Sequence, residues 1–404
     1  MKRNTRFMNH SVPKGFRLAG VHCGVKSDPS REDLTLITTD SDAVAAGVYT
    51  QNVVHAASVK QNRAKTPFDR FRVVVVNSGN ANACTGERGE QDAREMTRLA
   101  AKSVGATEDQ ALAMSTGIIG EYLPMDKLTA GITAAKAQLG TDSTAFDSAV
   151  RGITTTDKFV KVASRSIEMD GQSVQVTAMA KGAGMIGPNM ATMLCVVMTD
   201  AALAPTTAQR ILSTAVDESF NCMSVEGHMS TSDTVLLLAS GGSGVQLAGP
   251  SADQQLQEAL TAVCVELARM IPTDGEGASH LITIDVKGCA TREDAHRIAK
   301  TVADSPLVKT GVAGADPNWG RIVSAAGYAG VQFDVSQLTL SINGTLVYEN
   351  SMPVAFDDAV VSASIRDNHE TRLELTLAEG DSSIRYWTSD LTIDYVRFNS
   401  EYTT

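Results

Sequence analysis

The 404-residue sequence lacks the features that mark several common classes of protein. Its six cysteines lie far apart without a C-x-x-C pair, which argues against a zinc knuckle or a dense disulfide framework and fits a reducing cytosol. Lys and Arg form no basic stripe with interleaved aromatics and the formal net charge is −11, so nucleic acid is not an expected partner. No apolar window is long enough for a membrane helix, and the basic N-terminus lacks the apolar core of a signal peptide. We therefore expect a soluble, cytoplasmic protein.

Aromatic residues are few, at 5% of the chain, and small residues are abundant. This composition suggests tightly packed layers with close backbone approach. The chain is long for a single hydrophobic core, so we expect two domains or two covalent segments.

Strand and helix patterns alternate along the chain. The β-branched run at 71–77 predicts a buried strand, and apolar residues at helical spacing in 87–104 predict the helix that follows it. A second apolar run at 193–198 predicts another buried strand, and Ser251 is expected to cap a long helix. The patterns predict an α/β or α+β protein whose sheets are covered by helices.

The C-terminal portion is richer in strand signals. Asn343-Gly344 lies between two alternating segments and predicts a hairpin turn. The segment 373–387 predicts a second hairpin.

In the segment 180–200, a glycine-rich stretch (180–190, the lead-in) precedes an apolar run, and Ala191 and Thr192 lie between the two. A threonine hydroxyl becomes a nucleophile only with a base nearby, and one known solution uses the residue's own α-amino group once it is a chain N-terminus. Attack of the Thr192 hydroxyl on the Ala191 carbonyl would give an ester that water opens, leaving Thr192 with a free amine. From this segment alone, a threonine that merely begins a strand is the more frequent case.

The same segment resembles the signature of a known family. KGAGMIGPNMATML (181–194) is similar to a motif of the bifunctional ornithine/glutamate N-acetyltransferase family of arginine biosynthesis, in which the Thr of the ATML run is a nucleophile exposed by self-cleavage. Further segments look like blocks of this family, in its order and over nearly the whole chain: VVNSGNANACTG (75–86), STGIIG (115–120), TTTD (154–157), TDGEGA (273–278), SPLVKT (305–310), GADPNWGRI (314–322) and DYVRFNSEYTT (394–404).

The resemblance implies a role for each matching site residue. Thr192 would carry the acetyl group after cleavage of the bond from Ala191, and Thr116 and Gly117 would form the oxyanion hole, where a glycine N–H can approach a developing alkoxide closely. A lysine in the lead-in could pair with a substrate carboxylate, and a glutamate would suit the charged amine of ornithine. The substrate contacts implied are Thr155, Lys181, Thr192, Glu276, Asn399 and Thr404.

The resemblance also implies architecture, reaction and partners. The fold would consist of stacked αββα-type layers with helices outside paired sheets, plus a strand-rich C-terminal portion. Residues 1–191 would form an α chain and residues 192–404 a β chain, which assemble as a heterotetramer of two α and two β chains. The reaction would be ping-pong acetyl transfer from N-acetylornithine to glutamate without a metal or organic cofactor, and acetyl-CoA would be a substrate only if N-acetylglutamate is also made de novo.

Four positions depart from the usual residues of the family blocks. Glu226, His228 and Ser232 lie where aspartates and an asparagine are more usual, and His280 lies where a lysine is more usual. These departures leave open a paralogue with a different acyl donor or acceptor.

Two further functions remain open from the sequence. A self-cleaving threonine that passes its acyl group to water would make the protein an N-terminal-threonine amidase or aminopeptidase, and acetate release unaffected by glutamate would favour it. A non-catalytic protein would use the glycine-rich lead-in as an anion-binding concavity, with Thr192 as an ordinary strand residue.

Overall fold

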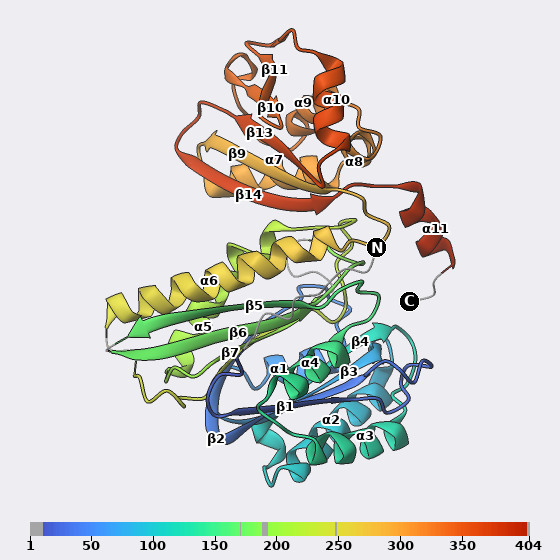
Figure 1. Ribbon diagram of the computed structural model, residues 1–404, viewed down its shortest axis with the longest axis vertical. Coiled ribbons are helices and arrows are strands. Elements are labelled where there is room, and N and C mark those ends of the chain that lie inside the picture. Colours follow the sequence, from blue (N-terminus) through green and yellow to red (C-terminus); the bar gives the residue numbers. More distant parts are fainter. Residues whose placement is uncertain (1–10, 170, 188–192, 247–248, 402–404) are drawn as a thin grey trace.

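The computed structural model describes residues 11–169, 171–187, 193–246 and 249–401 and contains two mixed sheets (Figure 1). The larger sheet has the order β4-β3-β2-β8-β7-β6-β5, with β1 paired to β2. Its strands are β1 (Phe16–Val21), β2 (Leu34–Tyr49), β3 (Phe68–Asn80), β4 (Ala111–Ile118), β5 (Lys161–Met169), β6 (Gln172–Lys181), β7 (Leu194–Thr199) and β8 (Thr234–Ala239).

The smaller sheet has the order β12-β11-β10-β13-β9-β14. Its strands are β9 (Leu281–Cys289), β10 (Thr339–Ile342), β11 (Thr345–Glu349), β12 (Met352–Pro353), β13 (Glu370–Thr376) and β14 (Ser382–Ser389). The α-helices of the described residues are α1 (Ala57–Arg63), α2 (Gly86–Ser103), α3 (Met125–Ala137), α4 (Ser143–Ile153), α5 (Pro205–Asp217), α6 (Pro250–Thr273), α7 (Arg292–Asp304), α8 (Pro306–Ala313), α9 (Trp319–Gly327), α10 (Asp358–Arg366) and α11 (Ile393–Glu401). None of them combines the length and apolar character needed to span a membrane.

The long strand β2 divides the larger sheet into two stacked layers. In its first half, Leu36 packs in a core with α2 and α3, while Ile37 faces the inner core. In its second half, Ala45 still faces the inner core, but Val44 and Ala46 pack in a core with α5 and α6. The two halves of one sheet therefore face each other across a shared core, to which α1 and α4 also contribute residues, while α2, α3, α5 and α6 lie outside the two halves (Figure 1). The predicted αββα layers are confirmed, and the paired inner layers belong to one continuous sheet.

Strand β7 connects the chain after residue 192 to the chain before residue 188 through hydrogen-bonded strand pairing. It pairs antiparallel with β6 and parallel with β8, which in turn pairs with β2. All six residues of β7 are buried, because Leu194 and Val196 face the inner core while Cys195 and Val197 face the helices. A strand buried on both faces explains the continuous apolar run in the sequence.

The smaller sheet confirms one predicted hairpin and contradicts the other. Asn343 and Gly344 have φ of +48° and +82° and connect the antiparallel strands β10 and β11. The second hairpin prediction was wrong, because β13 and β14 do not pair with each other but lie on either side of β9. The connection crosses the end of β9, where Leu377 N–H donates to Lys287 O at 2.9 Å.

The expected cap of helix α6 is also corrected. The helix begins at Pro250 rather than after Ser251, and its N-cap residue is Gly249, which has no side chain that could cap. Proline fits the first helical position because its missing N–H has no partner there in any case.

Candidate active site

A pocket opens at the ends of β4 and β6, where loops from distant parts of the chain meet. Its wall is formed by Ala81, Thr116, Gly117, Ile119, Thr155, Thr156, Lys181, Gly184, Met185, Ser230, Thr231, Ser232, Glu276 and Asn399. All six predicted site residues that the structure describes belong to this wall, whereas Ala191, Thr192 and Thr404 lie outside the described residues. The fold thus gathers these six residues at one place, and their individual roles remain predictions.

The turn at Thr116 and Gly117 accepts only glycine at its second position. Strand β4 runs parallel to β3, and Gly117 has φ of +132°, in the region that favours glycine. A Cβ on Gly117 would lie 2.2 Å from the carbonyl carbon of Gly79 in β3. Because Gly117 also lines the pocket, a bound molecule can approach its backbone closely.

Lys181, the last residue of β6, is buried beside this turn with 2% of its surface exposed. Its Nζ donates a hydrogen bond to Oγ1 of Thr116 at 3.3 Å. Burial lowers the pKa of Lys181, while the carboxylates of Asp157 and Glu276 act in the opposite direction. A positive charge at this place would stabilise negative charge that develops on a molecule bound near Thr116.

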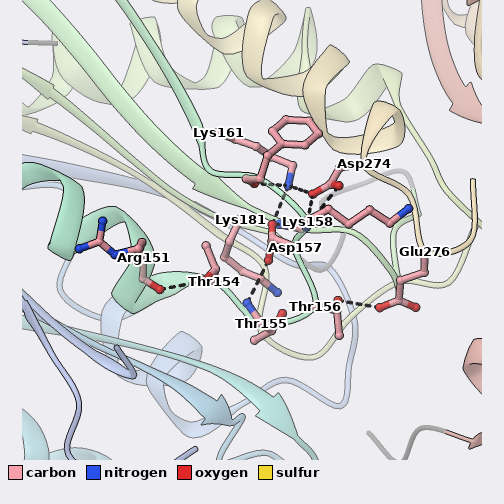
Figure 2. A network of polar contacts seen from close by, with 12 residues as sticks. Arg151, Thr154, Thr155, Thr156, Asp157, Lys158, Lys161, Lys181, Asp274 and Glu276 are labelled. Atoms are coloured by element: carbon pink, nitrogen blue, oxygen red, sulfur yellow. Dashed lines mark hydrogen bonds and ion pairs between the residues drawn. The ribbon is translucent and has the colours of Figure 1, made fainter. Parts of the chain in front are cut away.

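A buried network behind Lys181 fixes the loops around the pocket (Figure 2). Nζ of Lys161 lies 2.7 Å from Oδ1 of Asp157 and 2.6 Å from Oδ2 of Asp274. The Asp157 carboxylate also accepts the N–H of Gly182 at 2.8 Å and the N–H of Thr155 at 2.9 Å. One carboxylate therefore positions both the chain after Lys181 and the loop that carries Thr155.

Asp157, Lys161 and Asp274 were not predicted as site residues. Two opposite charges four residues apart, directly after Thr155, were a usable signal, whereas nothing local shows that Asp274 meets the same ammonium. Burial would raise the pKa of Asp157, but the ammonium groups of Lys161 and Lys181 outweigh it and hold that pKa below its usual value.

Glu276 lies on the loop after α6 and reaches the pocket through a gap left by a glycine. Its Oε1 accepts a hydrogen bond from Oγ1 of Thr156 at 2.7 Å, and its N–H donates to Ala183 O at 2.8 Å. A Cβ on Gly184 would lie 2.3 Å from Oε2 of Glu276. The glycine in the lead-in therefore makes room for this carboxylate.

Helix α11 carries Asn399 to the pocket and docks on the Glu276 loop. Oγ1 of Thr392 donates to Gly277 O at 2.6 Å, directly before the helix. A Cβ on Gly277 would lie 2.2 Å from the backbone nitrogen of Tyr395. The Glu276 loop and the C-terminal helix are thus packed backbone to backbone.

The four sequence departures occupy different environments. Ser232 is buried and lines the pocket. Glu226 accepts the N–H of Ile186 in the lead-in, and burial raises the pKa of Glu226 to about 8. His280 lies 3.0 Å from the buried carboxylate of Asp390, and His228 is exposed.

Asp233 holds Met193, the first residue that the structure describes after residue 187. Its Oδ1 accepts the N–H of Met193 at 3.1 Å, and Thr234 N–H donates to Met193 O at 3.1 Å. Burial raises the pKa of Asp233 well above its usual value. Met193 is thus fixed through both of its backbone polar groups.

The pocket brings together the kinds of group with which enzymes bind small charged molecules. Gly117, in its close-packed turn, and the buried ammonium of Lys181 come from the N-terminal part of the chain. The carboxylate of Glu276 and the amide of Asn399 come from the C-terminal part. Such a set can stabilise a developing oxyanion while it binds both charges of an amino acid.

Comparison with known proteins identifies the family. The ArgJ family profile matches residues 17–404, so the chain belongs to the ArgJ family. The "Arginine biosynthesis bifunctional protein ArgJ" of Rhodopirellula baltica is 48% identical over 405 residues, covering 100% of this chain and 98% of that protein. The protein of the same name from Symbiobacterium thermophilum is 43% identical and covers 98% of each chain. A crystal structure of the ArgJ protein from Bacillus halodurans is 35% identical with a TM-score of 0.50, over 51% of this chain and 98% of that chain.

Proposed function

We propose that this protein transfers an acetyl group from N2-acetyl-L-ornithine to L-glutamate through an acetylated Thr192, after cleavage of its own Ala191–Thr192 bond. The observation that carries the proposal is the convergence of all six described site residues on one pocket. Family membership supports an acetyltransferase, and both relatives reported above are named as arginine biosynthesis proteins.

The proposed reaction has two acyl-transfer steps. The Thr192 hydroxyl attacks the acetyl carbonyl while its own amine takes the proton, and the tetrahedral oxyanion is bound at Thr116 and Gly117. When the tetrahedral intermediate collapses, the amide bond breaks and the proton passes to the departing nitrogen. Ornithine then leaves, and the acetyl group stays on Thr192 as an ester. The amine of glutamate then attacks the carbonyl of this ester, the bond between the acetyl carbon and Oγ1 of Thr192 breaks, and the amine of Thr192 passes the proton from the attacking nitrogen to Oγ1, so that N-acetylglutamate leaves and the hydroxyl is restored.

The remaining pocket residues bind the amino acids in this scheme. The carboxylate of Glu276 pairs with the cationic amine of ornithine, and the ammonium of Lys181 pairs with a substrate carboxylate. Thr155, Asn399 and Thr404 supply further polar contacts. These steps use groups of the chain alone, so we propose that no metal or organic cofactor takes part.

Cleavage would give an α chain of residues 1–191 and a β chain of residues 192–404. The pairing of β7 with β6, and of β8 with β2, supports their continued association, since these hydrogen bonds do not depend on the cut peptide bond. The Bacillus halodurans chain, which matches 51% of this chain over 98% of its own length, supports a two-chain form. We extend the proposal to a heterotetramer of two α and two β chains, which native mass measurement would test.

Location and a second donor complete the proposal. A cytoplasmic location is supported by the six cysteines, which are all free in the structure and suit a reducing compartment. The two relatives are named bifunctional, and we propose acetyl-CoA as the second acetyl donor to be tested.

Product analysis tests the transfer. Purified protein with N-acetylornithine labelled in its acetyl group is expected to form labelled N-acetylglutamate only when glutamate is present. Labelled acetate formed at the same rate with and without glutamate would instead favour the amidase or aminopeptidase. A Thr192→Ala variant is the control, and we expect it to form neither product.

A further inference from the structure

Lys309 in α8 is a buried lysine outside the pocket whose three ammonium protons all have acceptors. The residue is 3% exposed. Its Nζ donates to Val225 O at 2.6 Å, to Oγ1 of Thr388 at 3.0 Å and to Ser389 O. An ammonium has three donors and no acceptor, so the group is fully satisfied by these contacts. Its partners come from two segments that are otherwise far apart in the sequence.

The first of these segments holds the lead-in to the proposed cleavage bond. Ile186 O accepts the N–H of Val225 at 3.0 Å and the N–H of Gly227 at 2.9 Å. The N–H of Ile186 donates to Oε1 of Glu226. Both backbone polar groups of Ile186 are thus bonded to the loop that Lys309 holds, directly after Met185 on the pocket wall.

The second segment leads into helix α11. Thr388 and Ser389 are the last residues of β14, and α11 begins at Ile393 and carries Asn399 to the pocket. The backbone of Lys309 contributes as well, since its carbonyl accepts the N–H of Leu391 at 3.4 Å. Lys309 therefore contacts the loop that holds the chain next to Met185. It also contacts the end of β14 that leads to α11 and Asn399.

We propose that Lys309 is a positioning residue of the acetyl-transfer site, whose ammonium ties the loop holding Ile186 to the strand end that carries α11. In this role it keeps Met185 and Asn399 at their places on the pocket wall without touching the substrate. The inference rests on the proposed function, and it gives a role to the SPLVKT block, which the site described above leaves unused.

The pH dependence of the Lys309 hydrogen bonds follows from the titratable groups around its ammonium. Burial lowers the pKa of Lys309 to about 8, while the carboxylates of Asp304, Glu226 and Asp390 oppose the shift. Above that pH the neutral amine has fewer protons to donate, so one acceptor loses its partner. Because the folded pKa lies below the unfolded one, this deprotonation does not reduce folding stability between about pH 8 and 10. A rise in KM in this window would therefore not come from loss of folding stability through Lys309; since the pKa of Glu226 is also raised to about 8, the pH profile of a Lys309 variant is needed to assign the rise to Lys309.

The test compares Lys309→Met with Lys287→Met, which removes a lysine of the same sheet region that is 51% exposed and pairs with Glu374 at 3.5 Å. We expect Lys309→Met to raise KM for N-acetylornithine at least tenfold with kcat changed less than threefold, and to remove the rise in KM above pH 8. Lys287→Met should leave both parameters and the pH profile unchanged. An unchanged KM in folded Lys309→Met would overturn the inference.

A double-mutant cycle with Asn399→Ala separates positioning from general damage. If Lys309 acts through α11, Asn399→Ala should raise KM clearly less in the Lys309→Met background than in the wild type. If the KM changes of the two single variants multiply in the double variant, the two residues act independently, which would contradict the inference. Should Lys309→Met not fold, Thr388→Val removes one of the three acceptors of Lys309 together with the hydrogen bond from Oγ of Ser224, and we expect KM to rise about twofold to fivefold. A folded Thr388→Val protein with wild-type KM would also contradict the inference.

Ornithine affinity measured by calorimetry distinguishes this inference from the proposed function. Wild-type protein that binds ornithine but forms no acetylated product would contradict the proposed function alone. In that case the inference still requires weaker ornithine binding by Lys309→Met. Wild-type acetyl transfer together with equal ornithine affinity of both proteins would contradict the inference alone.

Discussion

Two buried lysines support the pocket from opposite parts of the molecule, and their partners differ in charge. Lys161, at the start of β5 in the larger sheet, lies between the carboxylates of Asp157 and Asp274. Lys309, beside the smaller sheet, donates only to neutral oxygens. The first is part of an ion-pair network, whereas the second is a charge solvated by backbone and hydroxyl groups.

The difference matches what each lysine supports. The Lys161 network fixes the loop of Thr155 and the chain after Lys181, next to the turn proposed to bind the oxyanion. Lys309 holds the approaches to Met185 and Asn399, which are proposed to shape substrate binding. We therefore expect substitutions near β4 to β6 to lower kcat, and substitutions near α11 to raise KM.

Lys161→Met should have the largest effect, because it leaves two buried carboxylates without their cation. Breaking a buried ion pair from one side costs about 3–5 kcal/mol, and we expect a loss of that size in the free energy of unfolding. Urea denaturation followed by circular dichroism measures it. The double variant Lys161→Met/Asp274→Asn should recover part of the loss, and a single variant as stable as the wild type would contradict the network's importance.

Gly117→Ala should act on the rate of the chemical step. The added Cβ would collide with the Gly79 carbonyl carbon and displace the turn. Losing one oxyanion donor typically lowers kcat by about 100-fold to 1000-fold, and we expect a loss in this range with a smaller change in KM. Gly120→Ala is a suitable control, because Gly120 also has a positive φ, of +87°, so that its replacement strains the backbone as well, but a Cβ there meets no atom within 4 Å. A Gly117→Ala enzyme with full kcat would rule out the proposed oxyanion hole.

Glu276→Gln should act on binding, since it keeps the shape and removes the charge. A hydrogen bond to a charged group contributes about 1.5–3 kcal/mol, so we expect KM for N-acetylornithine to rise about tenfold to a hundredfold. Steady-state kinetics with a neutral N-acetylated amino acid as donor supplies the comparison, because that substrate lacks the side-chain amine. An equal rise in KM for both donors would show that Glu276 does not recognise the amine.

Ser232→Asn should have the smallest effect and sharpens the role of the departures. It introduces the residue that the family resemblance implies at a buried position of the pocket wall. We expect changes in kcat and KM of less than about fivefold for N-acetylornithine, as for small polar changes that keep hydrogen bonding. A switch in the preferred acyl donor, measured over a panel of N-acylated amino acids, would instead identify Ser232 as a determinant of specificity.

The sequence predicted the layers better than the connections between distant segments. The strands at 71–77 and 193–198 were recognisable because burial on both faces demands continuous apolar runs. The hairpin in 373–387 was predicted wrongly, because no local pattern shows that β9 lies between β13 and β14. Ser251 looked like a cap, but Pro250 already fits the first turn of α6.

The site was predictable where family blocks mark single residues and not where charges pair across the fold. Thr116, Lys181 and Glu276 were identified from their blocks and do lie around one pocket. The meeting of Asp157 and Asp274 on Lys161 depends on the packing of two loops that the sequence separates widely. Ala191, Thr192 and Thr404 lie outside the described residues, so their roles stay predictions.

The intact mass of freshly purified protein under denaturing conditions tests the central claim most directly. We predict two fragments of roughly half the length for the wild type, the second beginning Thr-Met-Leu-Cys, and one chain of 42.6 kDa for Thr192→Ala. A single uncut wild-type chain that is nevertheless active would contradict it, because Thr192 would then have no free amine to act as its base.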